Sequence, residues 1–162
     1  MTSELEVLII ELEAKKTDEK ARLEALEARI LKLEQDQVER EAKKNRKFQT
    51  RCIKIAKEIL NEEPIIEYRP PFLNGLELDA FFQKYRIALE VQGAQHRFHS
   101  TSWYKDVKKL VNRDRRKRCI CQDNRIFLIE VWYDEKLEIV IPERIQKIKE
   151  FICIASKRFN FL

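Results

Sequence analysis

The first 45 residues follow a heptad pattern of apolar and polar positions. Seven of the eleven core positions are apolar and form a stripe along one side of the expected helix, which the polar residues Lys16 and Glu19 interrupt. Residues 3–45 contain no glycine or proline. The pattern predicts a coiled-coil helix with a weak centre. An isolated helix leaves such a stripe in water, so we expect a homodimer through residues 1–45, with folding back onto the chain's own domain as the alternative. The core positions are Leu5, Ile9, Leu12, Lys16, Glu19, Leu23, Leu26, Ile30, Leu33, Gln37 and Arg40.

The helical pattern continues beyond residue 45 and then stops. Apolar residues recur at helical spacing from Phe48 to Ile59, and Pro64 ends the helix because the residue before a proline is pushed out of the α region. We therefore divide the chain into a coiled-coil segment, residues 1–45, and a folded domain, residues 46–162. A basic run crosses this boundary, and it is either a DNA backbone contact or a solvated helix face. It comprises Lys43, Lys44, Arg46, Lys47 and Arg51.

Short apolar runs in the folded domain predict four strands, at residues 65–71, 76–82, 87–91 and 125–132. Asn74-Gly75 is a turn signal between the first two strands, and a polar turn makes the next two a hairpin. Helices are predicted at residues 103–122 and from Ile141-Pro142 onwards. The last helix has a predicted buried side of Ile145, Ile148, Phe151, Ile152 and Phe159. The fold class is therefore mixed α/β (α+β), in the order helix, three strands, helix, strand, helix.

The predicted hairpin carries two carboxylates, Asp79 and Glu90, on otherwise apolar strands. Burying such groups is costly unless they are paired or bound to a cation. Mg²⁺ is typically held by one or two carboxylates, and waters and substrate phosphates complete its coordination. This stretch therefore predicts metal-dependent phosphate chemistry with Mg²⁺ or Mn²⁺, and a salt-bridged carboxylate pair is the alternative.

Charge is distributed unevenly along the 162 residues. The net charge is +5 with a sequence pI of about 9.0, and residues 1–40 hold 11 acidic and 7 basic residues, or −4, which leaves +9 for the remainder. A basic folded domain favours a polyanionic partner such as DNA. The sequence has no apolar run of membrane-spanning length and no secretory signal pattern, so we expect an intracellular protein in cytoplasm or nucleus. The four cysteines form no C-x-x-C pair, which favours free thiols over a zinc site.

Four blocks in order carry a family resemblance. They are Asp79, then Glu90-Val91-Gln92 within the run from Leu89 to His96, then residues 111–117, then residues 121–132. Together they resemble the PD-(D/E)xK restriction-endonuclease-like superfamily, and within it the Vsr-like and EDxHD endonucleases, over residues 65–133. The resemblance implies an αβββαβ core and a metal-dependent DNA endonuclease that hydrolyses phosphodiester bonds. An inactive nuclease-fold DNA-binding module and a coiled-coil interaction scaffold are the alternatives.

The resemblance also implies roles for individual residues. Asp79, Glu90 and the Val91 carbonyl would hold the metal ion. Gln92 stands where the family motif has a lysine that orients the attacking water. His96 would act as general acid or base, and Asp114 would bind the metal or orient His96.

The helix at residues 103–122 is strongly basic, with eight basic residues against two acidic ones. Contacts from such residues to phosphates provide affinity and salt dependence but do not read the sequence. With the earlier basic run, the predicted DNA contacts are Lys43, Lys44, Arg46, Lys47, Lys105, Lys108, Lys109, Arg113, Arg115 and Arg116.

Overall fold

The structure is a computed structural model that describes residues 2–93 and 104–159. The chain has a mixed α/β fold with a four-stranded sheet and three helices, one of them a long N-terminal helix. Two compact units are distinguished, Met1–Lys44 and Asn45–Leu162. The first unit is entirely helical where it is described, whereas the second contains the sheet.

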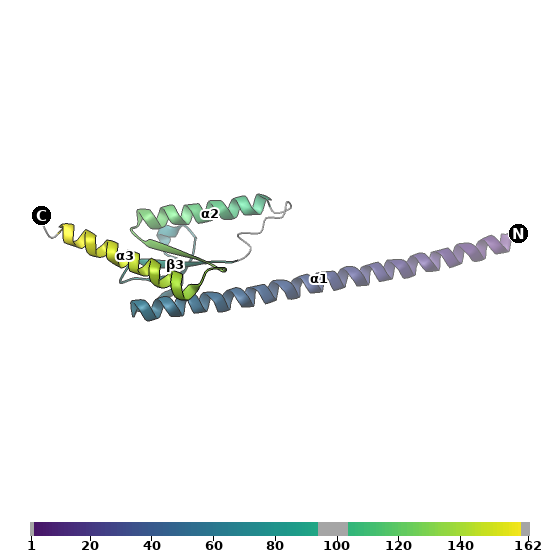
Figure 1. The fold of residues 1–162 in the computed structure, drawn as a ribbon. Helices are drawn as coiled ribbons and strands as arrows, with labels where there is room; N and C mark the ends of the chain where they lie inside the picture. Colours follow the sequence, from purple (N-terminus) through teal and green to yellow (C-terminus); the bar gives the residue numbers. More distant parts are fainter. Residues whose placement is uncertain (1, 94–103, 160–162) are drawn as a thin grey trace. The chain divides into compact units, whose positions relative to one another are not determined.

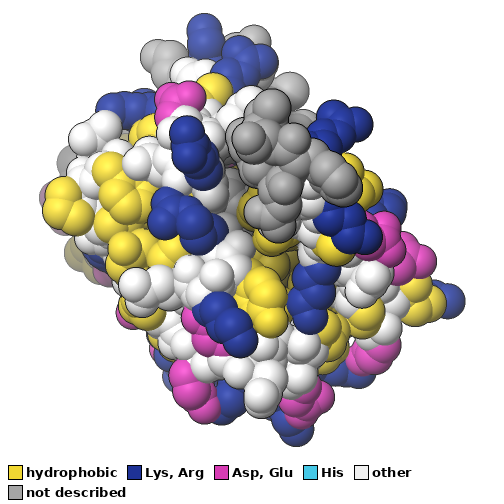
Figure 2. Space-filling model, turned by 90° about the vertical axis from the view of Figure 1, so that its left-hand side faces the viewer, with side chains coloured by type: hydrophobic (Ala, Val, Ile, Leu, Met, Phe, Trp, Pro, Cys, Tyr) yellow, Lys and Arg dark blue, Asp and Glu magenta, His cyan; other side chains and the backbone are white. Residues whose placement is uncertain are grey.

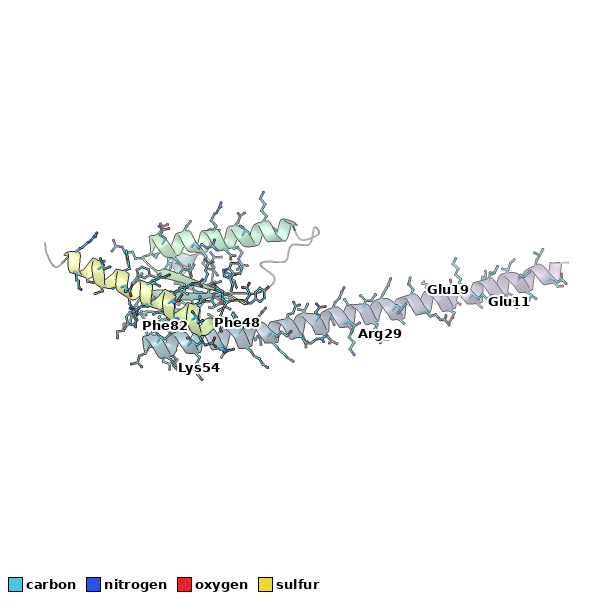
Figure 3. All side chains as sticks on the ribbon, viewed as in Figure 1. Glu11, Glu19, Arg29, Phe48, Lys54 and Phe82 are labelled. Atoms are coloured by element: carbon cyan, nitrogen blue, oxygen red, sulfur yellow. The ribbon has the colours of Figure 1, made fainter. Side chains whose placement is uncertain are left out.

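Helix α1 spans Thr2–Leu60. In the first unit, every described side chain from residue 3 to residue 44 is exposed, including the apolar core positions of the heptad pattern; Leu5 is 63% and Ile30 is 56% exposed. Figure 3 shows Glu11, Glu19 and Arg29 projecting from this part of the helix. The predicted continuous helix is therefore present, and in a single chain its apolar stripe faces solvent.

The sheet contains β1 (Ile65–Tyr68), β2 (Leu78–Phe82), β3 (Ile87–Gln92) and β4 (Phe127–Trp132), in that spatial order. Strands β1, β2 and β3 are antiparallel neighbours, and β4 runs parallel to β3. The first predicted strand, residues 65–71, was too long. Prolines at 70 and 71 cannot donate to a ladder, and the short 3-10 helix η1 (Pro71–Leu73) follows β1 instead.

Helices cover both faces of the sheet (Figure 1). On one face, the C-terminal part of α1 and helix α3 (Leu137–Phe159) enclose a core that includes Phe82 and Leu89. Phe48 of α1 packs against this core, in agreement with the labelled positions in Figure 3. On the other face, a second core contains η1, Phe81 of β2 and Cys121 of α2 (Tyr104–Asp123).

Helix α3 differs from the sequence prediction at its start and in its buried face. It begins at Leu137 rather than Ile141, so Pro142 lies inside it. Pro142 is the sixth residue of the helix and lies beyond the first four residues, whose N–H groups lack an intrahelical partner. Its missing N–H therefore removes one intrahelical hydrogen bond. The Phe151 side chain, predicted to be buried, is 60% exposed and packs edge-on against Phe127, with ring centroids 5.9 Å apart. Ile145 is buried as predicted, whereas the side chain of Phe159 lies outside the described residues.

Candidate catalytic site

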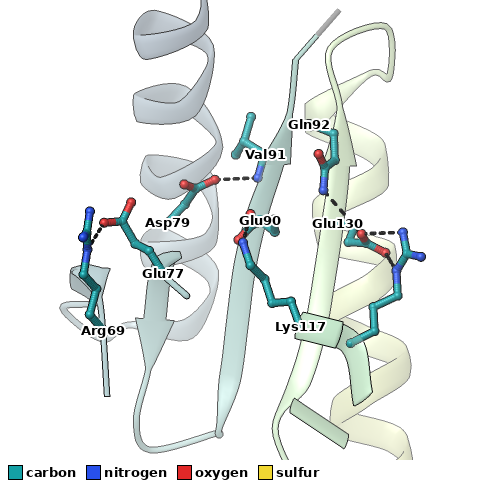
Figure 4. A network of polar contacts seen from close by, with 9 residues as sticks. Arg69, Glu77, Asp79, Glu90, Val91, Gln92, Lys117 and Glu130 are labelled. Carbon is teal, nitrogen blue, oxygen red and sulfur yellow. Dashed lines mark hydrogen bonds and ion pairs between the residues drawn. The ribbon is translucent and has the colours of Figure 1, made fainter. Parts of the chain in front are cut away.

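The hairpin brings Asp79 and Glu90 to the same level of the sheet. The ladder between β2 and β3 runs from Phe82–Ile87 to Ala80–Leu89, and its continuation would place Asp79 opposite Glu90. The ladder stops there. One carboxylate oxygen of Asp79, Oδ2, accepts the Val91 backbone N–H at 2.7 Å, in place of a backbone carbonyl (Figure 4).

Glu90 is an incompletely satisfied carboxylate. Its side chain is 12% exposed and its Oε1 is paired with the Lys117 ammonium. Its Oε2 is buried and has no hydrogen-bond partner among the described residues. Burial and, next, the negative charge of Asp79 raise the pKa of Glu90 to about 7, against the opposing effect of Lys117. Burial also raises the pKa of Asp79, although the Val91 N–H opposes the shift. The surroundings of both Asp79 and Glu90 therefore disfavour the ionised form of the carboxyl group.

Lys117 is the site residue that the sequence prediction missed. It was counted among the basic residues of a DNA-binding helix, but its side chain is only 9% exposed and reaches Glu90 from α2 (Figure 4). Helical phase is the signal that could have identified it. Lys117 precedes the buried Cys121 by four residues, so both lie on the sheet-facing side of α2.

Asp114 lies one turn before Lys117 on α2 and is half-buried. Its negative charge contributes to the raised pKa of Glu90, which places it in the electrostatic surroundings of the site. Asp79, Glu90, Lys117 and Asp114 thus belong to one local group. His96, the predicted general acid or base, lies outside the described residues.

Gln92 is turned away from the two carboxylates towards β4. Its side chain is 2% exposed, and its Nε2 donates to Glu130 Oε1 at 3.4 Å. Glu130 also accepts two hydrogen bonds from the Arg118 guanidinium, each at 2.7 Å. Gln92 therefore takes part in a polar network with β4, whereas Lys117 is the cationic group that contacts Glu90.

Acidic residues form a row across the sheet, one from each strand. Glu130 is directly opposite Glu90, and the registers place Asp79 level with Glu90 and Glu67 level with Asp79. Glu67 adopts a left-handed backbone conformation with φ 49°, and its charge contributes to the raised pKa of Asp79. Lys117 and Arg118 pair with the two acids nearest α2.

The donors at Asp79 and Glu90 fit a hard divalent cation. No group of three or more His, Cys, Asp or Glu side chains in the described part of the chain is arranged to hold a metal. Mg²⁺, however, is commonly held by one or two carboxylates with waters and substrate phosphates. Glu90 offers a buried oxygen that no described residue hydrogen-bonds, and the Val91 carbonyl faces β2 together with its N–H. The ligand set of Asp79, Glu90 and Val91 stays a prediction.

The predicted DNA contacts lie on exposed positions of α1 and α2. Nine of the ten side chains are exposed, and the side chain of Lys105 lies outside the described residues. On the face shown in Figure 2, lysine and arginine side chains are spread over much of the surface, with apolar side chains exposed between them. Among the described helices, none is long and apolar enough to cross a membrane.

A cleft of about 920 Å³ opens beside β4 and reaches the candidate site only through Glu130 and Arg118. Its walls include the basic residues Lys84, Arg86 and Arg125. The Arg86 guanidinium donates to the backbone carbonyls of Asn124 and Arg125, so it fastens the β2–β3 turn to the end of α2. Neither Asp79 nor Glu90 lines this cleft.

Comparisons with known proteins give two viral relatives. The chain is 37% identical over 90 residues to "Uncharacterized protein 307L" of Invertebrate iridescent virus 6, covering 47% of this chain and 46% of the relative. It is 32% identical over 101 residues to "Uncharacterized protein 033L" of Invertebrate iridescent virus 3, covering 57% and 52% respectively. The chain thus spans about half the length of each relative. No family model matches the sequence, and no solved structure matches the fold.

Proposed function

We propose that this chain is a metal-dependent DNA endonuclease of the PD-(D/E)xK superfamily, of the Vsr-like or EDxHD type. The observation that carries the proposal is the contact of the buried Lys117 ammonium with Glu90, beside Asp79 on the hairpin. The family motif that the sequence resembles combines two acids with a lysine, and Gln92 stands in the lysine position. Lys117 supplies the missing positive charge from α2.

The order of elements supports the same proposal. A helix, three antiparallel strands, a helix and a strand parallel to β3 follow one another, as the αβββαβ core of that superfamily requires. Asp79 and Glu90 lie on the second and third strands, and Lys117 and Asp114 lie on the following helix.

The chain's own groups would divide the work as follows. Asp79, Glu90 and the Val91 carbonyl would bind Mg²⁺ or Mn²⁺, which when bound polarises a phosphate and lowers the pKa of a coordinated water. The Lys117 ammonium would stabilise negative charge that develops on the phosphate oxygens. Gln92, held by Glu130, would maintain the end of β3 against β4 rather than orient water. His96 would transfer the proton, as the family resemblance implies.

An inactive nuclease-fold module that binds DNA is the second candidate. The observation that favours it is the ion pair itself, because Lys117 already neutralises one oxygen of Glu90 and would compete with a bound cation. Such a module would keep the exposed basic residues of α2 as phosphate contacts.

The test is cleavage of supercoiled plasmid with Mg²⁺ or Mn²⁺. We expect the wild-type protein to cut, and Asp79→Ala, Glu90→Ala and Lys117→Met each to lose at least about 100-fold in rate, a loss typical of removing one electrostatic catalytic group. Lys54→Met, at an exposed position on α1, is the control and should cut like wild type. Circular dichroism and DNA affinity of each variant would show that loss of cutting is not loss of folding.

The outcomes separate the two candidates. Salt-sensitive DNA binding by wild type without cleavage in either metal would establish the inactive module. Cleavage that survives Lys117→Met but not Asp79→Ala would leave the metal site in place and remove Lys117 from the chemistry. Absence of both DNA binding and DNA cleavage would favour the alternative in which the protein is a coiled-coil interaction scaffold.

We also propose that the protein is a homodimer formed through residues 1–45 of α1. The exposed apolar stripe of that segment supports it, because a partner helix would remove the stripe from water. Sedimentation of the full chain tests the proposal, and a monomer at all concentrations would contradict it.

A further inference from the structure

We propose that the two copies of α1 pair antiparallel, in the register that sets Lys16 of one copy opposite Glu19 of the other. In this register the residue numbers of two facing core positions add up to 35. This inference rests on the proposed homodimer and specifies its geometry. It is drawn from the two polar residues that interrupt the stripe, Lys16 and Glu19. Both are exposed in the single chain and occupy consecutive core positions of the heptad pattern.

The charges of this interruption are opposite, and their spacing suits a two-fold axis between residues 17 and 18. In an antiparallel pair, each a position faces a d position of the other helix. The register that sets Lys16 opposite Glu19 of the second copy repeats the same contact on the other side of the axis. Each ammonium thus faces a carboxylate between the apolar layers.

The same register matches six of the seven apolar core positions with one another, and the seventh, Leu33, falls opposite Thr2. Leu5 faces Ile30, Ile9 faces Leu26, and Leu12 faces Leu23. All six of these side chains are more than half exposed in the single chain, so the pairing covers surface that is otherwise in water. At the flanking positions, Glu13 faces Lys20 of the second copy, whereas Glu6 faces Glu27 and Lys15 faces Arg22. Such exposed pairs contribute little, so the argument for the register rests on the core positions.

Other antiparallel registers lack this match. A shift by one heptad in one direction sets Lys16 against Leu12 and Glu19 against Ile9. A shift in the opposite direction sets Lys16 against Leu26 and Glu19 against Leu23. Either shift buries a charge against an apolar side chain, which is costly without a partner. The interruption therefore selects one register.

A parallel pair of α1 helices would form favourable ion pairs at its flanking positions but would bring like charges together in its core. Arg22 would face Glu27 and Arg29 would face Glu34 across the flanks, but exposed ion pairs contribute little. In the core, Lys16 would face Lys16 and Glu19 would face Glu19 in adjacent layers. Like charges next to the apolar seam repel in a poorly solvated environment, so the core favours the antiparallel arrangement.

The test measures distances between spin labels in the full-length protein. Single cysteines replace Glu4 or Asp18, which are exposed and occupy the same c position of the heptad, so they are matched sites. The exposed thiols at Cys119 and Cys153 are first changed to serine, while Cys52 and Cys121 are buried. Pulsed electron spin resonance then reports the label-to-label distance in each dimer.

The antiparallel register predicts two different distances. The labels at residue 4 should be about 40 Å apart or more, because 27 residues of helix separate them at 1.5 Å each. The labels at residue 18 should lie within about 25 Å, the width of two packed helices. Equal short distances at both sites would overturn the antiparallel pairing and keep the homodimer. Absence of any dipolar coupling would overturn both, without bearing on the nuclease proposal.

Discussion

Glu90 is the residue whose protonation state limits the proposed chemistry. One of its oxygens is paired with Lys117, and the other is buried and has no partner in the part of the chain that the structure describes. Its pKa is raised to about 7, first by burial and then by the charge of Asp79. At neutral pH, the carboxyl group is therefore protonated in a substantial fraction of molecules. The proposed divalent cation would bind the carboxylate form, so protons and metal would compete for this side chain.

This competition predicts the pH dependence of cleavage. At subsaturating Mg²⁺, the rate should fall about tenfold for each pH unit below about 7 and level off above it, because only the deprotonated Glu90 binds the cation. Initial rates of plasmid nicking between pH 5.5 and 8.5 measure the profile. Raising the Mg²⁺ concentration should move the midpoint to lower pH. A rate independent of pH below 7 would contradict the role of Glu90.

The sequence identifies some of these residues and misses others for physical reasons. Asp79 and Glu90 stand out because charged residues on apolar strands are unusual. Lys117 is one of eight basic residues on a helix, and only its phase relative to Cys121 distinguishes it. The direction of Gln92 depends on the parallel pairing of β3 with β4, between segments 38 residues apart, which no local pattern encodes.

Among the elements, β4 is the strand at the edge of the sheet that follows the parallel crossover. Its outward backbone groups are partly covered by side chains. The Arg144 guanidinium donates to the Glu130 carbonyl, and the Trp132 N–H donates to Glu135 Oε2 at 2.9 Å. Arg144 also bonds both carboxylate oxygens of Glu135, at 2.7 and 3.1 Å. This arrangement blunts an edge that would otherwise be available to another strand.

We therefore expect Arg144→Ala to weaken both folding and solubility. The variant loses charge-assisted hydrogen bonds that are partly exposed, which should lower the free energy of unfolding by about 1–2 kcal/mol. It also frees the β4 edge, so light scattering should show more concentration-dependent association. Urea denaturation measures the first effect. Lys147→Ala, an exposed change on the same helix, is the control, and equal behaviour of the two variants would contradict the capping role.

Element positions were predictable where a local pattern repeats. Strands β2, β3 and β4 and helix α2 lie within two residues of their predicted bounds because each combines an apolar run with a clear turn or break, whereas β1 ends at Tyr68 before the two prolines. Pro142 misled the prediction of the start of α3, since a proline favours the first turn of a helix, whereas Pro142 is the sixth residue of α3. Phe151 misled the prediction of its buried face, because the end of α3 extends past the main core.

For the whole molecule, charge divides between an acidic segment and a basic domain, and the basic domain would carry DNA affinity. Residues 1–40 carry −4 and the remainder carries +9. Exposed basic residues of α2 include Lys109 and Arg116. Phosphate contacts by such residues release counterions, which makes the affinity depend on salt.

The salt dependence can be tested one residue at a time. If Lys109 contacts a phosphate, Lys109→Ala should reduce the slope of log affinity against log salt concentration by about 0.9 for duplex DNA. Lys54→Ala on α1, which also removes one exposed positive charge, should leave the slope close to that of wild type. Fluorescence anisotropy at several salt concentrations provides the measurement. Equal slopes in the two variants would place the DNA contact elsewhere.

The buried contact between Lys117 and Glu90 has a consequence for how the sequence can change over time. Removing two charges from water is seldom fully repaid by their attraction, and apolar replacements of similar size are often equally or more stabilising. Here Glu90 Oε2 also has no hydrogen-bond partner within residues 2–93 and 104–159. Selection for thermostability alone would therefore tend to replace Lys117 and Glu90 with apolar residues. A more thermostable engineered variant should keep both residues if the proposed cleavage activity is to be retained.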